Sequence, residues 1–189
     1  FHIFGTPTII VARPNGEEID RIVGFHSAPE FVSKIKDYKK GKNTLGDLEN
    51  KVSKKPKDVN LLYTLGDKHQ GRGNYDRAVE LYKQILSVDP ENKRFKSDSA
   101  AFNLASIKYR QKDFLGAVSE FEKFKATYSN SGLVTEADIY IPVCYQRGED
   151  KQKALEYFQR YIQLHPKGED VDYATEQIGK LQQELGQAE

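Results

Sequence analysis

The sequence predicts a mainly α-helical protein, an α-solenoid of antiparallel helix hairpins preceded by a short β segment. An alanine followed four residues later by an aromatic residue recurs at Ala78, Ala117 and Ala154, at intervals of 39 (117 − 78) and 37 (154 − 117) residues. Self-similarity at such a period is typical of helical repeat proteins. Ahead of these repeats, residues 1–38 are rich in β-branched and aromatic residues and are broken by turn signals. That composition is typical of strands.

The composition excludes several classes of function. The chain has 189 residues, with 29 Lys and Arg against 28 Asp and Glu, so its net charge is only +1. It therefore lacks the basic field that nucleic-acid binders use. No apolar run approaches the ~18 residues that a membrane span needs. We expect neither nucleic acid nor a membrane span to be involved in its function.

The N-terminal segment predicts a β-hairpin followed by a helix. The apolar run 8–12 and the run 19–24 flank four turn residues, Arg-Pro-Asn-Gly, and this pattern indicates two paired strands. Ser27 is then suited to cap a helix, and Pro29 to occupy its first turn. We expect this helix over residues 29–38.

The order FHIFGTPT, hairpin and helix resembles the C-terminal third of a thioredoxin-like domain, over about 38 residues. The resemblance implies a cis-proline loop at Thr6 and Pro7. It also implies a C-x-x-C redox motif upstream of Phe1, and the absence of Met from the chain adds to the expectation of a missing N-terminal piece. An unrelated hairpin and helix is the alternative. A segment this small needs a surface to pack on, which the first helices, a second copy in a homo-oligomer or the missing piece would supply.

The later part of the chain resembles the tetratricopeptide repeat family. Small residues stand where the two helices of a repeat touch, an aromatic residue lies on the second helix, and proline precedes the next repeat. The first copy has this pattern at Leu62, Leu65, Gly66, His69, Ala78, Tyr82 and Pro90, and two further copies follow around Ala117 and Ala154. In such arrays each helical hairpin exposes an apolar face that only the next hairpin covers. Pro142 departs from the pattern, so we expect its helix to kink or to start late.

These patterns divide the chain into four parts. We expect a partial thioredoxin-like segment at 1–38, a basic linker with a half-repeat helix at 39–58, three repeats at 59–169 and a C-terminal capping helix at 170–189.

No pattern of catalytic or metal-binding residues stands out. The four histidines are scattered, without the spacing of metal ligands. Cys144 has no partner for a disulfide, and we expect it to pack in the core as a small apolar residue. We therefore expect no catalysis in this chain, no metal site and no cofactor.

The resemblance to tetratricopeptide repeats implies a peptide-binding groove on the concave face, lined by the first helix of each repeat. It assigns to this groove Tyr63, Asp67, Phe102, Asn103, Tyr109, Arg110, Tyr140 and Arg147. Only Asn103 fits the pattern by which some members grip a terminal carboxylate. We therefore expect an aromatic groove that takes apolar side chains of an extended segment or a helix. Ordinary packing between helices is the alternative for Phe102, Ile139 and Tyr140.

Two hypotheses about function stay open. The first is a scaffold for protein interaction, which binds a polypeptide partner in the groove. The second is the C-terminal part of a thioredoxin-like thiol-disulfide oxidoreductase or redox-linked chaperone, because bacterial chaperedoxin-type proteins have this order of domains. Residues 121–131 also resemble bacterial envelope assembly factors, so we expect a bacterial source, with cytoplasm or periplasm left open.

Overall fold

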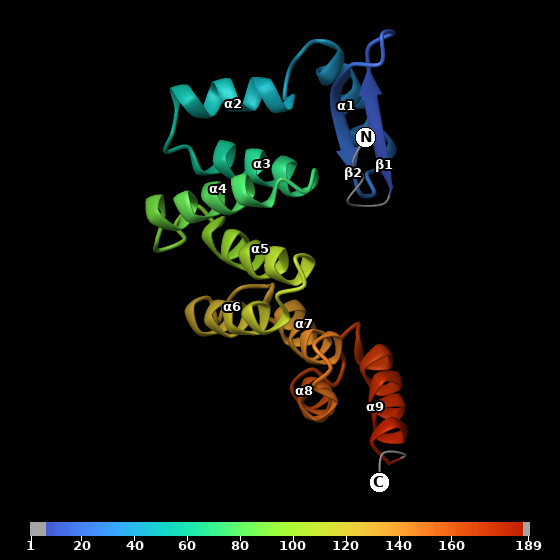
Figure 1. Cartoon of the computed structure of the whole chain (residues 1–189). Coiled ribbons are helices and arrows are strands. Elements are labelled where there is room, and N and C mark those ends of the chain that lie inside the picture. The colour runs from blue at the N-terminus through green and yellow to red at the C-terminus, as the bar shows by residue number, and fades with distance from the viewer. Residues whose placement is uncertain (1–6, 187–189) are drawn as a thin grey trace. The chain divides into compact units, whose positions relative to one another are not determined.

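The computed structural model describes residues 7–186, which pack as two compact units, one up to Ser97 and one from Asp98 (Figure 1). The first unit holds β1 (Thr8–Ala12), β2 (Glu18–Val23), α1 (Ala28–Lys39), α2 (Leu45–Lys54), α3 (Val59–Gln70) and α4 (Tyr75–Val88). The second holds α5 (Ser97–Arg110), which begins at the boundary, α6 (Phe114–Thr127), α7 (Val134–Arg147), α8 (Lys151–Leu164) and α9 (Val171–Gly186). The predicted fold class, a mainly helical repeat protein with an N-terminal β-hairpin, is confirmed.

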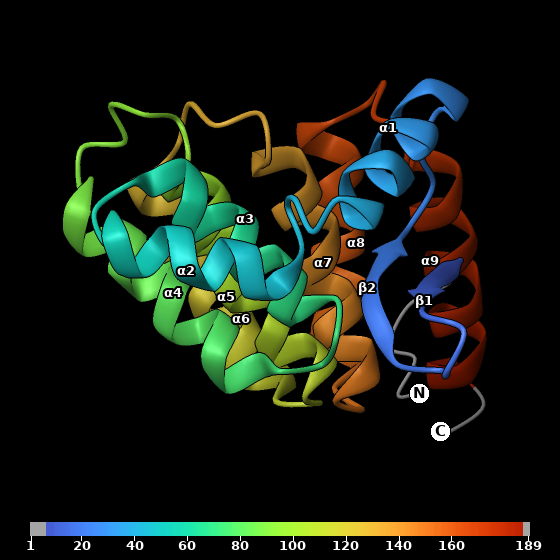
Figure 2. The same cartoon turned by 90° about the horizontal axis from the view of Figure 1, so that it is seen from above.

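The predicted β-hairpin is formed by β1 and β2, which lie next to each other (Figure 2). The two strands run antiparallel, with Ile9 opposite Ile22. In the turn, Gly16 has φ 84° and its N–H donates to the Arg13 carbonyl at 2.9 Å. Glycine enters this left-handed region without a steric cost, which makes the tight turn possible. Helix α1 follows, and the Glu30 carboxylate accepts hydrogen bonds from the Ser27 backbone N–H at 3.0 Å and hydroxyl at 2.8 Å.

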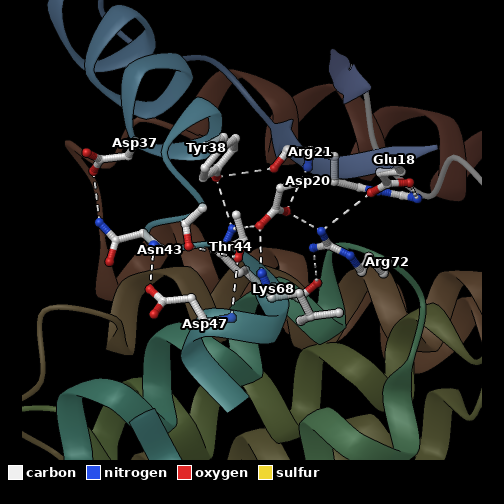
Figure 3. A network of polar contacts seen from close by, with 12 residues as sticks. Glu18, Asp20, Arg21, Asp37, Tyr38, Asn43, Thr44, Asp47, Lys68 and Arg72 are labelled. Carbon is white, nitrogen blue, oxygen red and sulfur yellow. Dashed lines mark hydrogen bonds and ion pairs between the residues drawn. The ribbon is translucent and has the colours of Figure 1, made fainter. Parts of the chain in front are cut away.

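A buried polar network joins the hairpin to three helices of the first unit (Figure 3). Asp20 on β2 is 0% exposed. Its carboxylate accepts hydrogen bonds at 2.8 Å from the Lys68 ammonium on α3 and from the Leu45 N–H that begins α2, and it pairs with Arg72. Lys68 also donates to the Tyr38 hydroxyl on α1 at 2.9 Å. The first helices thus supply part of the surface that the small hairpin needs.

Helices α3 and α4 pack as the predicted first repeat, and a glycine sets how closely they approach. A Cβ atom at Gly66 would lie 2.8 Å from the ring of Tyr82, so the close contact requires glycine. Ala78 and Tyr82 on α4 are 0% exposed, and the Tyr82 hydroxyl donates to the Gln70 side chain at 2.8 Å. The small and aromatic residues therefore meet at the interface that their spacing predicts.

In the second unit, each aromatic residue predicted for the second helix of a repeat fills a core. Phe121 on α6 and Phe158 on α8 are both 0% exposed. Phe121 packs with α5 and α7 residues, among them Ala105 and Ile141, and α9 covers α8 through Ala174 and Leu181. Each hairpin of this unit is thus covered by the helix that follows it.

Helix α7 runs through Pro142, so the expected late start is wrong, and the kink that was its alternative stays a prediction. The helix begins at Val134, and Pro142 lies inside it and is buried. Proline has no N–H to donate to the Asp138 carbonyl one turn earlier. The Asp138 side chain, however, binds Lys125 at 2.6 Å and His165 at 2.7 Å. These contacts tie α7 to α6 and to the end of α8, and neighbouring helices hold the proline-containing turn in place.

Candidate peptide-binding groove

A pocket of about 720 Å³ lies in the second unit between α7 and the start of α9. The loop before α9 closes one side of it, and Gly168 in this loop approaches Tyr161 so closely that a Cβ atom would lie 2.7 Å from the tyrosine hydroxyl. The lining residues are Gly132, Thr135, Glu136, Ile139, Tyr140, Val143, Lys167, Gly168, Glu169, Asp170 and Tyr173. Helix α7, the loop before α9 and the start of α9 therefore border a hollow in the second unit.

Aromatic rings extend this pocket toward α5. The rings of Tyr109 and Tyr140 meet edge to face, with centroids 5.6 Å apart, and Tyr140 stacks on the core ring of Phe121 at 5.4 Å. Tyr140 is half-buried and lines the pocket. Burial, with the nearby charge of Glu136, raises the pKa of its hydroxyl above the ordinary value. Tyr109 and Tyr140 thus place aromatic side chains on the α5 side of the pocket. We use the name α5–α7–α9 groove for the pocket together with these two rings.

Phe102 does not belong to this groove, so its expected role as an exposed anchor is wrong. Its side chain is 6% exposed. Its ring packs edge-on against Phe121 and Phe124, with ring centroids 5.3 Å and 5.7 Å apart. The position faces α6, because α5 and α6 form one hairpin with a common core. The alternative of ordinary packing between helices is correct for Phe102.

The groove carries opposite charges at the two ends of α7. Glu136 lies in the first turn of this helix and Arg147 in its last turn. Partial burial and the nearby Asp170 raise the pKa of Glu136. Arg147 and Arg110 are exposed at the C-terminal ends of α7 and α5, where a positive charge also favours the helix dipole. A bound segment would therefore meet an acidic end and a basic end.

The remaining predicted residues are divided between the two units. Asn103 on α5 is half-buried. Tyr63 and Asp67 lie on α3 in the first unit, where the Tyr63 ring packs on Tyr82 with centroids 5.9 Å apart and Asp67 is exposed. Of the predicted set, Tyr140 lines the pocket and Tyr109 contacts its ring. Arg110 and Arg147 lie at the C-terminal ends of α5 and α7, where their charges act on Tyr140 and Tyr173.

The N-terminal loop residues of the predicted set fall at the edge of the described structure. Thr6 lies outside the described residues. The Pro7 carbonyl accepts a hydrogen bond from the Gly24 N–H at 2.9 Å, which closes the open end of the hairpin. Their role as a cis-proline loop stays a prediction.

Sequence reasoning missed Glu136, Asp170 and Tyr173. A usable signal was present, because Ala174 follows Ala137 by 37 residues (174 − 137), the interval that separates Ala117 from Ala154. This spacing makes α9 the register equivalent of α7, and it places Tyr173 at the position of Glu136. The apolar stripe of residues 170–189 by itself predicts only a capping helix and does not indicate that Tyr173 lines the pocket.

Cys144 lies in the core of the second unit, and burial raises the pKa of its thiol to about 12. Because the thiolate is the reactive form, we expect the native protein at pH 8 to resist a maleimide reagent, and the protein in denaturant to react fully. Mass spectrometry of timed samples measures both rates. Comparable rates in the two conditions would show that Cys144 is accessible in the native state.

Residues 7–186 hold neither a membrane-spanning helix nor a cluster of metal ligands. No helix in this range is both long and apolar enough to cross a membrane. In the same part of the chain, no three His, Cys, Asp or Glu side chains are placed to hold a metal ion.

Stacked helix hairpins with small residues at their contacts, and a groove along their first helices, define the tetratricopeptide repeat class. The comparisons agree with this assignment. Residues 59–92 match the tetratricopeptide repeat model, and residues 94–175 match the YfiO model, described as outer membrane lipoprotein. The chain therefore contains a tetratricopeptide repeat and has the fold of this class. The second match includes residues 121–131, which carried the resemblance to envelope assembly factors.

Solved structures show the same fold at low sequence identity. A protein with nearly identical TPR-like repeats from Podosopora anserina has TM-score 0.58 and 17% identity, over 76% of this chain and 78% of that one. MamA has TM-score 0.58 and 19% identity, over 75% of this chain and 72% of MamA. The first TPR of Spaghetti (RPAP3), solved with the HSP90 peptide SRMEEVD, has TM-score 0.52 and 24% identity. The match covers 68% of this chain and 95% of that one.

One curated relative, the RNA polymerase-associated protein CTR9 of Saccharomyces cerevisiae, is 29% identical over 114 residues. The match covers 57% of this chain and only 10% of the relative. Both family-model matches begin at or after residue 59. The thioredoxin-like interpretation of residues 1–38 finds no support in these comparisons and stays a prediction.

Proposed function

We propose that this chain is a protein-interaction scaffold and that it binds an extended segment of a partner polypeptide in the α5–α7–α9 groove. The observation that carries the proposal is the pocket of about 720 Å³ between α7 and α9, lined by Tyr140 and Tyr173. Pockets of this size take a few side chains of a ligand. The first TPR of Spaghetti, which shares the fold, was solved with a bound peptide.

Tyrosines on rigid helices are suited to anchor such a segment. Tyr173 is 40% exposed, and Tyr109 and Tyr140 are half-buried. Each ring offers a large contact area, and a tyrosine loses little conformational entropy when a ligand covers it. Tyr173 also touches the core ring of Phe158, with centroids 6.0 Å apart, so its position is already set before a ligand arrives.

Replacing Tyr173 with alanine tests this function. We expect peptide affinity to fall about 5- to 150-fold, or about 1–3 kcal/mol, because an anchor of the pocket is lost. Stability should change little, since the ring is already 40% exposed. A peptide selected from a random displayed library, labelled and followed by fluorescence anisotropy, measures the affinity, and thermal melting measures the stability.

The matched control is Leu164→Ala, at the end of α8, where the side chain is 54% exposed and lies outside the pocket. It should leave the affinity unchanged. A library that yields no binder, or binders equally tight for wild type and Tyr173→Ala, would count against the groove as the binding site.

We also propose a second function, which concerns the first unit, where the order β1, β2, α1 resembles that of the C-terminal third of a thioredoxin-like domain. Ile9, Phe25 and Val32 are 43%, 93% and 48% exposed in this part of the chain. This uncovered apolar surface favours a further element of a thioredoxin-like protein, in which a redox site and the repeats act together. The coding sequence upstream of Phe1 tests it, because the proposal requires a C-x-x-C motif about 40 residues before Phe1.

A further inference from the structure

We propose that the pocket between α7 and α9 selects a basic side chain, Lys or Arg, of the bound segment. The inference rests on the proposed function, because the pocket is part of the α5–α7–α9 groove. It adds the chemistry of the ligand, a cationic residue with apolar neighbours.

The charges in the pocket favour a cation. Glu136, Glu169 and Asp170 line it, against one basic residue, Lys167. Among residues 7–186, no ion pair joins any of these three carboxylates to a basic side chain of the protein. Asp170 lies close enough to Glu136 to raise the pKa of that carboxyl, so the two charges repel each other when the pocket is empty. A cation placed between them would relieve this repulsion.

The uncharged lining fits the rest of a Lys or Arg side chain. Tyr140 and Tyr173 line the pocket with aromatic rings, and the face of such a ring attracts a cation within about 6 Å of its centre. Ile139 and Val143 add an apolar wall, against which the methylene stem of a long basic side chain can pack. An acidic side chain would gain nothing from the rings and would meet three like charges.

The basic end of α7 adds a prediction about spacing. Glu136 and Arg147 are separated along the helix by about 16 Å at about 1.5 Å per residue. An extended chain covers this distance in about five residues. A segment whose basic residue occupies the pocket should therefore favour an acidic residue about five positions away, opposite Arg147.

A random nonapeptide library displayed on phage tests the inference with the full chain as bait. We expect wild type to enrich Lys and Arg together about fivefold or more at one peptide position. The double variant Glu136→Gln, Asp170→Asn should lose this enrichment. Glu156→Gln, an exposed carboxylate on α8 outside the pocket, should keep it.

A charge exchange on one selected peptide sharpens the result. Changing its basic residue to Glu should weaken binding to wild type about fivefold to fiftyfold, because the peptide then loses its ion pairs and cation–π contacts in the pocket. The variant Glu136→Lys should recover at least part of the loss, and it should fold because this side chain is exposed.

The outcomes separate the two proposals. Binders that depend on Tyr173 but show no basic preference would overturn the inference and leave the proposed function standing. If no peptide binds, or if the binders are unaffected by changes in the groove, both proposals fail.

Discussion

Replacing Asp20 with alanine is expected to lower the free energy of unfolding of the first unit by about 3–5 kcal/mol, the cost of removing one partner from a buried ion pair. The carboxylate is 0% exposed and meets Lys68, Arg72 and the Leu45 N–H. Its removal leaves two cations at a site with little access to water, and it takes an acceptor from the N-terminus of α2. Urea unfolding followed by circular dichroism measures the loss.

An exposed ion pair in the same hairpin provides the control. Arg13 and Glu17 are 3.3 Å apart, and their side chains are 60% and 64% exposed. Glu17→Ala should cost less than about 1 kcal/mol, as is usual for surface pairs. The loss in Asp20→Ala should also be smaller when Lys68→Met is already present, because the two residues act on each other. A loss no larger than that of Glu17→Ala would mean that the network does not hold the hairpin.

The same carboxylate makes the stability depend on pH. Burial alone would raise the pKa of Asp20, but the hydrogen bonds and charges of Lys68 and Arg72 outweigh it and hold the pKa below its ordinary value. A carboxyl with a lowered folded-state pKa stabilises the fold above its unfolded pKa of about 3.9, and the stabilisation disappears as the pH falls through the folded pKa. The difference in the free energy of unfolding between wild type and Asp20→Ala should therefore become smaller below about pH 4.

Truncating Phe121 to alanine should destabilise the second unit by about 3–5 kcal/mol, through lost burial and the cavity left behind. The ring is 0% exposed, and its centroid lies 5.3 Å from that of Phe102 and 5.4 Å from that of Tyr140. Phe102→Ala should have an effect of the same order, because its ring belongs to the same core. Pulse labelling of Cys144 during urea unfolding reports on this unit alone, since the chain has one cysteine.

Leu115, on the same helix as Phe121, provides the contrast. Its side chain is 68% exposed, and Leu115→Ala should stay within about 0.5 kcal/mol of wild type, as most surface substitutions do. If the Phe102→Ala variant has the melting temperature of wild type but no longer binds peptide, Phe102 is a binding residue and not part of the core.

Local pattern in the sequence was enough for the order of elements. The turn of the hairpin depends on Gly16 and its close neighbours, and the repeats depend on small residues such as Ala78 and aromatic residues such as Tyr82, whose spacing along each helix decides which face is buried. These are short-range properties, because backbone conformation and helix periodicity are set within a few residues. The hairpin, the helical repeats and the core positions of Tyr82, Phe121 and Phe158 were therefore predictable.

The candidate site and the polar network depend on contacts between distant parts of the chain, and only the tertiary structure decided them. Asp20 meets Lys68 48 positions later, and nothing near either residue in sequence indicates the pair. Glu136 and Asp170 line the same pocket, Glu136 from helix α7 and Asp170 from the loop before α9. Helix periodicity shows that Phe102 and Tyr140 lie on the inner surfaces of their helices, but which ring is covered depends on the neighbouring helices. Burial and charge pairing are properties of the packed molecule, because each is decided by the atoms that surround a side chain in space.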